Sequence, residues 1–187
     1  KVCENLGLIN KFEAAMPVLE DPVYRSNPDF FIYTDTREQS RLKIEYPIQM
    51  AALPYGDYSL SDTSLNNIFV ERKALGDFIG TLSGGLERFE REIERCEKDS
   101  NYLVVLVEEK LHNLLNFNNI NRMAKRRKAD PIFIMHRARM LCQKYRNSQI
   151  VCVDGRQEAA RVLRKILFSN GQCKKIDIQL AYETALL

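Results

Sequence analysis

The sequence predicts an α/β fold in which a mixed central β-sheet is flanked by helices. Short apolar runs typical of buried strands alternate along the chain with longer segments typical of helices. The chain has 187 residues, of which 45% are hydrophobic and 28% are charged, and these values argue against wholesale disorder. We therefore expect one main domain with a short appendage.

The appendage is predicted at the N-terminus, over residues 1–29. Lys1–Glu20 has apolar side chains near helical spacing and is predicted to form a short amphipathic helix. Asp21–Asp29 carries the Pro, Ser and Asn residues typical of a linker. Residues 30–187 would then form the main domain.

The first half of the main domain is predicted to be rich in strands. Phe30–Asp35 is an apolar run that ends in a carboxylate, and Ile44–Leu53 is apolar but ambiguous between helix and strand. Pro54–Leu60 and Ile68–Lys73 are separated by a polar segment of turn-forming residues. We expect these two segments to pair as a β-hairpin.

Helices and buried strands alternate in the second half. Tyr102–Val107 is a nearly continuous apolar run, as in a strand covered on both faces, and Ile150–Val153 is a second short strand. The predicted helices are Ala74–Lys98 with a break at Gly84-Gly85, Leu111–Arg127, Pro131–Arg146, and Gln157–Phe168 with an apolar stripe of Ala160, Leu163 and Leu167.

The net charge of +3 hides an uneven distribution. The segment Arg122–Arg146 holds nine basic residues and one acid, so it carries +8 and the rest of the chain carries −5. Such a run is usually a solvated face, and its Lys125–Lys128 part also resembles a nuclear-import signal. A basic segment of this kind can also form a surface that binds a polyanion.

Composition excludes several classes of protein. No stretch approaches the roughly 20 apolar residues of a membrane helix, so no membrane partner is expected. The five cysteines are odd in number and lack CxxC spacing, which argues against a disulfide framework and a complete zinc site. Reduced thiols fit an intracellular compartment, either cytoplasm or nucleus.

A possible site for chemistry lies around the predicted hairpin. Side chains alternate along a strand, so Glu71 and Lys73 point to one face and Arg72 to the other. Asp57, on the partner strand, can face Glu71. Two carboxylates suit Mg²⁺ or Mn²⁺, and Lys73 beside them can orient or help deprotonate a water. The spacing fits metal-dependent phosphodiester hydrolysis.

A wider set of motifs resembles one nuclease family. The motifs are Asp35-Thr36-Arg37-Glu38, Gly56-Asp57-Tyr58, and Val70-Glu71-Arg72-Lys73 with Asp77 after three further residues. Together they resemble the XPF-type domain, named for xeroderma pigmentosum group F, of the restriction-endonuclease-like superfamily. The resemblance extends over Phe30 to Gly155 and implies a restriction-endonuclease-like core.

The resemblance also implies roles for the acids and the lysine. Asp57 and Glu71 would be the main metal ligands, and the Arg72 carbonyl can add a third donor. Lys73 would act on the nucleophilic water. Asp35 and Glu38 would complete the acidic site, either by direct ligation of the metal or through metal-bound water.

The remaining motif residues would support this site. Arg37 and Arg72 would bind phosphate or brace the acidic cluster, and Asp77 would hold the cluster from the following helix. Because a nuclease must hold a polyanion, we expect DNA contacts from the basic segment. The best candidates are Arg122, Lys125, Arg126 and Arg127.

The resemblance implies partners as well. Members of the family pair their nuclease domains into homodimers or heterodimers, and they cut DNA near branches or single-strand/duplex junctions. The apolar helices Pro131–Leu141 and Gln157–Phe168 could form the dimer surface or belong to the core.

Two other functions remain open. A nuclease of the same superfamily, such as a junction resolvase or a recombination exonuclease, would share the site but differ in substrate. A non-catalytic DNA-binding or scaffold subunit would share the fold, although such a subunit would be expected to lack some of the acids.

Overall fold

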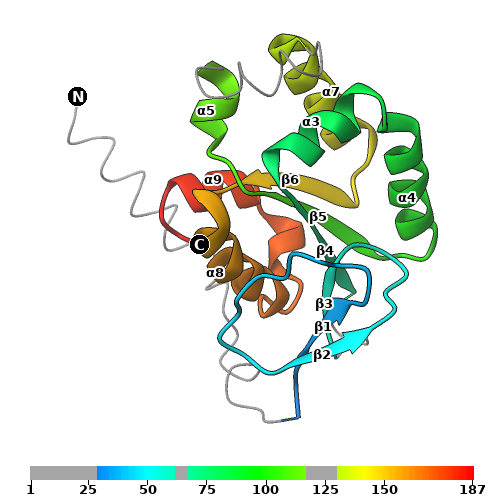
Figure 1. The fold of residues 1–187 in the computed structure, drawn as a ribbon, viewed down its shortest axis with the longest axis vertical. Helices are drawn as coiled ribbons and strands as arrows, with labels where there is room; N and C mark the ends of the chain where they lie inside the picture. The colour runs from blue at the N-terminus through cyan, green and yellow to red at the C-terminus, as the bar shows by residue number, and fades with distance from the viewer. Residues whose placement is uncertain (1–28, 62–66, 117–129) are drawn as a thin grey trace.

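A computed structural model describes residues 29–61, 67–116 and 130–187 (Figure 1). Within these ranges the strands form one six-stranded sheet, in the order β2-β1-β3-β4-β5-β6. The strands are β1 (Ile32–Asp35), β2 (Ile48–Ala51), β3 (Tyr58–Leu60), β4 (Ile68–Lys73), β5 (Tyr102–Val107) and β6 (Ser148–Cys152).

The sheet is mixed, as predicted. β3 is antiparallel to both β1 and β4, whereas β1–β2, β4–β5 and β5–β6 are parallel pairs. The carboxyl ends of β1, β4, β5 and β6 therefore lie at one edge of the sheet, and β3 begins at that same edge. Side chains at these strand ends are brought together although they are distant in sequence.

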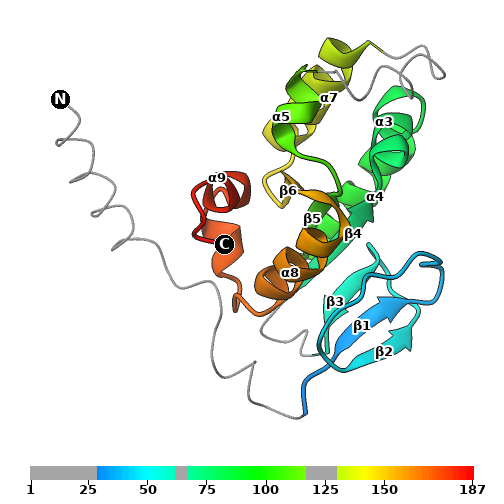
Figure 2. The same cartoon turned by 60° about the vertical axis from the view of Figure 1, so that its left-hand side comes forward.

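Helices cover both faces of the sheet (Figure 2). The helices α3 (Leu75–Ser83), α4 (Leu86–Lys98), α5 (Leu111–Asn116) and α7 (Pro131–Lys144) lie on one face. On the other face lie α8 (Gly155–Leu167), the 3-10 helix η1 (Gln172–Lys175) and α9 (Ile178–Glu183). None of the helices in the described ranges is long and apolar enough to cross a bilayer.

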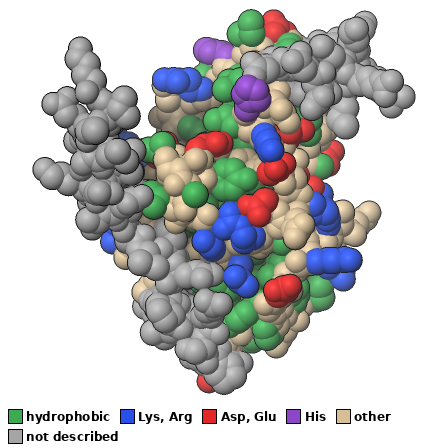
Figure 3. Space-filling view, turned by 90° about the vertical axis from the view of Figure 1, so that its left-hand side faces the viewer, with side chains coloured by type: hydrophobic (Ala, Val, Ile, Leu, Met, Phe, Trp, Pro, Cys, Tyr) green, Lys and Arg blue, Asp and Glu red, His purple; other side chains and the backbone are tan. Residues whose placement is uncertain are grey.

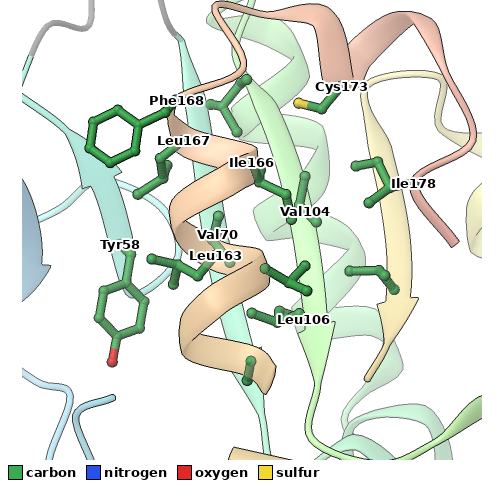
Figure 4. Packing of buried hydrophobic residues seen from close by; sticks show 14 of the residues in the cluster. Tyr58, Val70, Val104, Leu106, Leu163, Ile166, Leu167, Phe168, Cys173 and Ile178 are labelled. Atoms are coloured by element: carbon green, nitrogen blue, oxygen red, sulfur yellow. The ribbon is translucent and has the colours of Figure 1, made fainter. Parts of the chain in front are cut away.

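The core is divided by the sheet into two layers. Every residue of β5 is buried, because this strand lies between β4 and β6 and is covered on both faces. Figure 4 shows α8 packed across the strands, with Leu163 and Ile166 among the side chains that meet Val70, Val104 and Leu106. The opposite layer buries apolar side chains of α3, α4 and α7 against the sheet.

Most of the predicted elements are confirmed. The hairpin forms as β3 and β4, the Gly84-Gly85 break separates α3 from α4, and Tyr102–Val107 is the central strand. The ambiguous segment Ile44–Leu53 contains the short strand β2, whose first three residues are exposed at the edge of the sheet. An exposed edge strand lacks the buried face that produces a clear alternating pattern.

Two expectations change. The apolar stripe of α8 is Ala159, Val162, Leu163, Ile166 and Leu167, whereas the predicted Ala160 is only partly buried at its margin. The apolar face of a surface helix usually includes more positions than the three that were predicted. On α8 this face is centred between Ala159 and Ile166. The tail beyond Gly171, for which no structure was predicted, forms η1 and α9.

Other expectations fall outside the described ranges. These include the N-terminal helix Lys1–Glu20 and the linker Asp21–Asp29, of which only Asp29 is described, so the domain division stays a prediction. The predicted helix Leu111–Arg127 is described only up to Asn116. Four cysteines lie within the described ranges, and all four are free thiols: Cys96, Cys142, Cys152 and Cys173.

Candidate active site

The predicted acids gather at the carboxyl edge of the sheet. Asp35 ends β1, Asp57 immediately precedes β3, and Glu71 lies near the end of β4. The Asp35 N–H donates to the Asp57 carbonyl at 2.8 Å, and the Asp57 N–H donates to the Val70 carbonyl at 2.8 Å. Since Tyr58 is registered opposite Val70, Asp57 lies across from Glu71, as the hairpin predicted.

Glycine is required immediately before Asp57. Gly56 has φ +56, a conformation that costs most other residues free energy. A Cβ at this position would lie 2.9 Å from the Val70 carbonyl oxygen. The turn therefore brings the backbone against β4 closely enough to set Asp57 beside Glu71.

Asp57 and Glu71 form a half-buried acidic pair. One Asp57 oxygen, Oδ2, accepts from the Arg72 N–H at 2.9 Å, and Glu71 is paired with Lys73. Burial, with the nearby Glu71 charge, raises the pKa of Asp57 to about 7. Burial also raises the pKa of Glu71, although Lys73 opposes the shift. Adding a cation here would relieve the repulsion between the two carboxylates.

The Asp35 carboxylate connects two neighbouring segments of the chain through hydrogen bonds to Arg37 and Leu53. This carboxylate is buried and accepts from the Arg37 side chain at 2.7 and 2.9 Å, from the Arg37 N–H at 2.7 Å and from the Leu53 N–H at 2.7 Å. The hydrogen bonds from Arg37 hold the pKa of Asp35 below its usual value. Both Asp35 oxygens are thus occupied, and its role as a metal ligand stays a prediction. Arg37 is the side-chain partner of Asp35, and its predicted roles, to brace the acidic cluster or to bind phosphate, stay predictions.

Arg72 occupies the other face of β4, as the alternation of the strand predicts. Its guanidinium forms two hydrogen bonds of 2.8 Å with Glu108, the residue that follows β5. Its Nη1 also lies 3.8 Å from Glu38 Oε2. The Glu38 charge contributes to the raised pKa of both Asp57 and Glu71, so Glu38 belongs to the same electrostatic cluster.

A cleft of about 320 Å³ opens beside the acidic pair on the α3–α4 side of the sheet. Asp77, exposed in the first turn of α3, lines this cleft with Glu71 and Lys73. The other side chains that line it include Thr81, Arg88, Phe89 and Glu92. The Lys73 ammonium lies 5.4 Å from the centroid of the Phe89 ring, a distance suitable for a cation–π contact.

Glu92 is a site residue that sequence reasoning missed. Its Oε1 accepts from the Gly56 N–H at 3.3 Å, and its charge helps to raise the pKa of Glu71. It lies on α4, in a stretch that is dense in charged residues. Helical spacing alone does not show which of several acids faces the sheet.

The chemistry of these donors fits a Mg²⁺ or Mn²⁺ ion. Across the described ranges, no three acidic, His or Cys side chains are grouped closely enough to hold an ion by themselves. Mg²⁺ is commonly bound by one or two carboxylates, several waters and phosphate oxygens, so the Asp57–Glu71 pair is sufficient. The carbonyl and the N–H of Arg72 point to the same side of β4, and the N–H donates to Asp57. The Arg72 carbonyl oxygen can therefore serve as a further metal ligand.

The chain's similarity to known proteins agrees with this geometry. A family model described as the ERCC4 domain matches residues 32–166. The chain belongs to the ERCC4 domain family. Its resemblance to XPF-type domains, stated from the motifs, is confirmed. No curated protein sequence matches the chain.

Two solved structures share the fold of this ERCC4 domain. XPF from Aeropyrum pernix in complex with DNA superposes with a TM-score of 0.54 at 20% identity, covering 73% of this chain and 62% of that one. XPF from Aeropyrum pernix without DNA gives 0.53 at 19% identity, covering 73% and 59%. The chain thus spans less than two thirds of either protein. The predicted restriction-endonuclease-like fold is confirmed.

The basic segment of the ERCC4 domain is only partly described. The predicted DNA contacts Arg122, Lys125, Arg126 and Arg127 lie outside the described residues. Two other basic residues of the segment have intramolecular partners. Arg137 donates to the last carbonyls of α3, at Leu82 and Ser83, and Lys144 pairs with Glu90. Part of the +8 charge therefore stabilises the fold.

Proposed function

We propose that this ERCC4 domain is a metal-dependent endonuclease that hydrolyses phosphodiester bonds of branched, flap or junction DNA. The observation that carries the proposal is the half-buried Asp57–Glu71 pair at the carboxyl edge of the sheet, where Glu71 and Lys73 line a cleft. Repair, recombination and replication are the processes in which such DNA arises.

Each residue has a distinct part in the proposed reaction. Asp57 and Glu71 would hold Mg²⁺ or Mn²⁺, which supplies charge for the scissile phosphate and lowers the pKa of a bound water. Lys73, which is paired with Glu71, would orient the attacking water and move its proton. Glu38 would contribute charge to the same acidic cluster.

Acids near the scissile phosphate repel DNA unless cations offset them. Arg88, exposed on α4, lines the cleft and can meet a neighbouring phosphate. The segment with Arg122, Lys125, Arg126 and Arg127 would add phosphate contacts along the duplex. The DNA bound to XPF from Aeropyrum pernix supports DNA as the partner.

A cleavage assay tests the proposal. The chain is incubated with flap, fork, four-way-junction and linear duplex DNA in Mg²⁺, Mn²⁺ or chelator. We expect cleavage only with metal, and a loss of about 100-fold or more for Asp57→Asn and Glu71→Gln, because each removes charge from a metal ligand. Glu87→Gln, an exposed carboxylate of α4, is the matched control and should cut normally.

The same assay separates the alternative functions. A preference for four-way junctions would indicate a resolvase, and digestion from duplex ends would indicate an exonuclease. Metal-independent DNA binding without any cleavage would indicate a scaffold subunit. Unchanged cleavage by Asp57→Asn and Glu71→Gln would refute the proposed site.

We also propose that the domain pairs with a second copy or with a related ERCC4 domain. The proposed surface is an apolar groove of about 660 Å³ between α5, α7 and β6. Leu115 of α5 and Ile132 of α7 line it and are 56% and 78% exposed. Of the two helices considered from sequence, α7 presents apolar residues to this groove, whereas the apolar stripe of α8 lies in the core.

A further inference from the structure

We infer that Arg156, in the first turn of α8, is a positioning residue that holds Glu38 beside the acidic pair. The inference rests on the function proposed above, and it involves contacts between residues that are 115 or more positions apart in the sequence. Two routes of contacts connect Arg156 to the two carboxylate oxygens of Glu38.

The first route runs through the backbone of the loop that carries Glu38. Arg156 Nη2 donates to the Ser40 carbonyl at 2.5 Å and to the Arg41 carbonyl. The N–H of Ser40 donates in turn to Glu38 Oε1 at 2.5 Å. Residues 36–47 form no helix or strand, so side chains must fix the course of this loop. Arg156 fixes the Ser40 backbone on which one Glu38 oxygen depends.

The second route runs through ion pairs that lead from the surface toward the site. Arg156 Nη1 lies 3.3 Å from Glu108 Oε1, and the same oxygen accepts from Arg72 Nε at 2.8 Å. Arg72 Nη1 then lies 3.8 Å from Glu38 Oε2. The side chains of Arg72 and Glu108 are each 10% exposed, whereas Arg156 is 40% exposed. Arg156 is therefore the outer member of a network that ends at the candidate active site.

The loop keeps other anchors when Arg156 is removed. Thr36 N–H donates to the Ala51 carbonyl at 3.0 Å, and Leu42 N–H donates to the Tyr58 hydroxyl at 2.8 Å. These bonds hold the two sides of the loop, but they do not hold the peptide at Ser40. Substituting Arg156 should thus release Glu38 locally and leave the domain folded.

A double-mutant cycle on single-turnover DNA cleavage tests the inference. The set is the parent chain, Arg156→Ala, Glu38→Ala and the double variant, assayed at saturating DNA with Mg²⁺. We expect Arg156→Ala to slow cleavage about tenfold, as expected for loss of a residue that orients active-site groups, while DNA affinity without metal stays unchanged. In the Glu38→Ala background the same substitution should have no further effect. Full additivity of the two losses, or weaker DNA binding, would overturn the inference.

The matched control is Arg161→Ala on the same helix. Arg161 is 37% exposed, close to the value for Arg156, but it is bonded to Glu158 and to the Leu187 carbonyl. It should cleave within about twofold of the parent. Arg156→Gln is measured in parallel. If both Arg156 variants unfold, Arg156 belongs to the framework of the fold and the inference is wrong.

Amide hydrogen exchange gives a readout that does not depend on cleavage. Exchange over residues 38–42 should be faster in Arg156→Ala than in the parent and unchanged in Arg161→Ala. Equal exchange in all three proteins would refute the positioning role. If the parent cuts no DNA, the proposed function fails, whereas the exchange measurement still decides whether Arg156 holds the loop.

Discussion

The Asp57–Glu71 pair is held together at a cost to the fold. Both carboxylates are partly withdrawn from water, and burial is the main cause of their raised pKa values. Lys73 offsets part of this cost for Glu71, and the Arg72 N–H offsets part of it for Asp57. A site that binds a divalent cation has this character, because the ion supplies the missing positive charge.

The raised pKa of Asp57 makes a prediction about stability and pH. A carboxyl whose pKa rises on folding, here from 3.8 to about 7, stabilises the fold below pH 3.8, and this contribution is lost as the pH rises through 7. Asp57→Asn removes the charge and keeps an acceptor for the Arg72 N–H. We expect it to be more stable than the parent by about 1–2 kcal/mol at pH 8, reduced from the full shift because Asp57 is only partly buried.

Urea denaturation at pH 4, 6 and 8 measures this difference. The gain should vanish near pH 4, and Mg²⁺ should reduce it at pH 8 by stabilising only the parent. Glu87→Gln should show no such pH-dependent gain. Equal stability of Asp57→Asn and the parent at pH 8 would show that neither burial nor the Glu71 charge raises the pKa of Asp57 on folding.

Gly56 and Gly84 form a natural pair for testing backbone conformation. Gly56→Ala should lower the free energy of unfolding by about 1–3 kcal/mol, because it combines a positive φ with a Cβ 2.9 Å from the Val70 carbonyl oxygen. Gly84 has φ −116 and free space around it, so Gly84→Ala should be neutral or slightly stabilising. Thermal denaturation compares the two. A Gly56→Ala protein as stable as the parent would mean that the turn can relax.

The central pair of the site could be predicted from sequence, but its neighbours Glu92 and Glu108 could not. Alternation along one strand places Glu71 and Lys73 together, and a single hairpin adds Asp57. Glu92 and Glu108 depend on how a helix and a neighbouring strand pack onto that hairpin. Such long-range contacts leave no regular spacing in the sequence.

Secondary structure is predictable where burial or glycine leaves a clear pattern in the sequence. β5 and the α3–α4 break are found because burial and glycine leave clear patterns. β2 is ambiguous in the sequence because its first three residues are exposed at the sheet edge. On α8, three apolar positions are too few to define the buried stripe, which has five residues. In both cases the sequence pattern is weak because packing against other elements decides which residues are buried.

The contact between α7 and α3 predicts a structural role for one arginine of the basic segment. Arg137 Nη1 donates to the Leu82 and Ser83 carbonyls at 2.6 and 2.7 Å, and these carbonyls have no partner further along α3. Arg137→Ala should therefore lower the free energy of unfolding by about 1–2 kcal/mol. Arg139→Ala, an exposed arginine of the same helix, should have little effect.

Urea denaturation and DNA-binding titrations distinguish the two roles of such arginines. If the role of Arg137 is structural, the folded fraction of Arg137→Ala should bind DNA with the same affinity as the parent. Weaker DNA binding with unchanged stability would instead make Arg137 part of the phosphate-binding surface.

The charge of the whole chain is unevenly distributed. The total of +3 combines an acidic remainder with the basic segment, and part of that segment is neutralised internally by Glu90 and Glu94. Figure 3 shows a face on which Lys and Arg side chains lie beside acidic ones and do not form a continuous basic surface. The DNA path is expected on the α3–α4 side, because Lys73 and Arg88 line the cleft there together with Glu71.

The apolar groove makes a prediction about assembly. Two large apolar side chains that line the groove are exposed, and an exposed apolar patch of this kind usually marks a binding surface. They are Leu115 and Ile132. Ile132 is 78% exposed, so Ile132→Lys should leave the monomer folded while placing a desolvated charge in any interface formed there. Size-exclusion chromatography with light scattering should show a dimer for the parent and a monomer for Ile132→Lys.

Met50→Lys is the matched control for this substitution. Met50 is also exposed, at 43%, but it lies on the edge strand β2, and lysine is well tolerated on edge strands. It should remain dimeric at the same concentration. A monomeric parent would exclude self-association of this chain, and a related ERCC4 domain would then be the partner to test against the groove. If Met50→Lys dissociates and Ile132→Lys does not, the interface lies at the sheet edge, and the proposal for the groove is wrong.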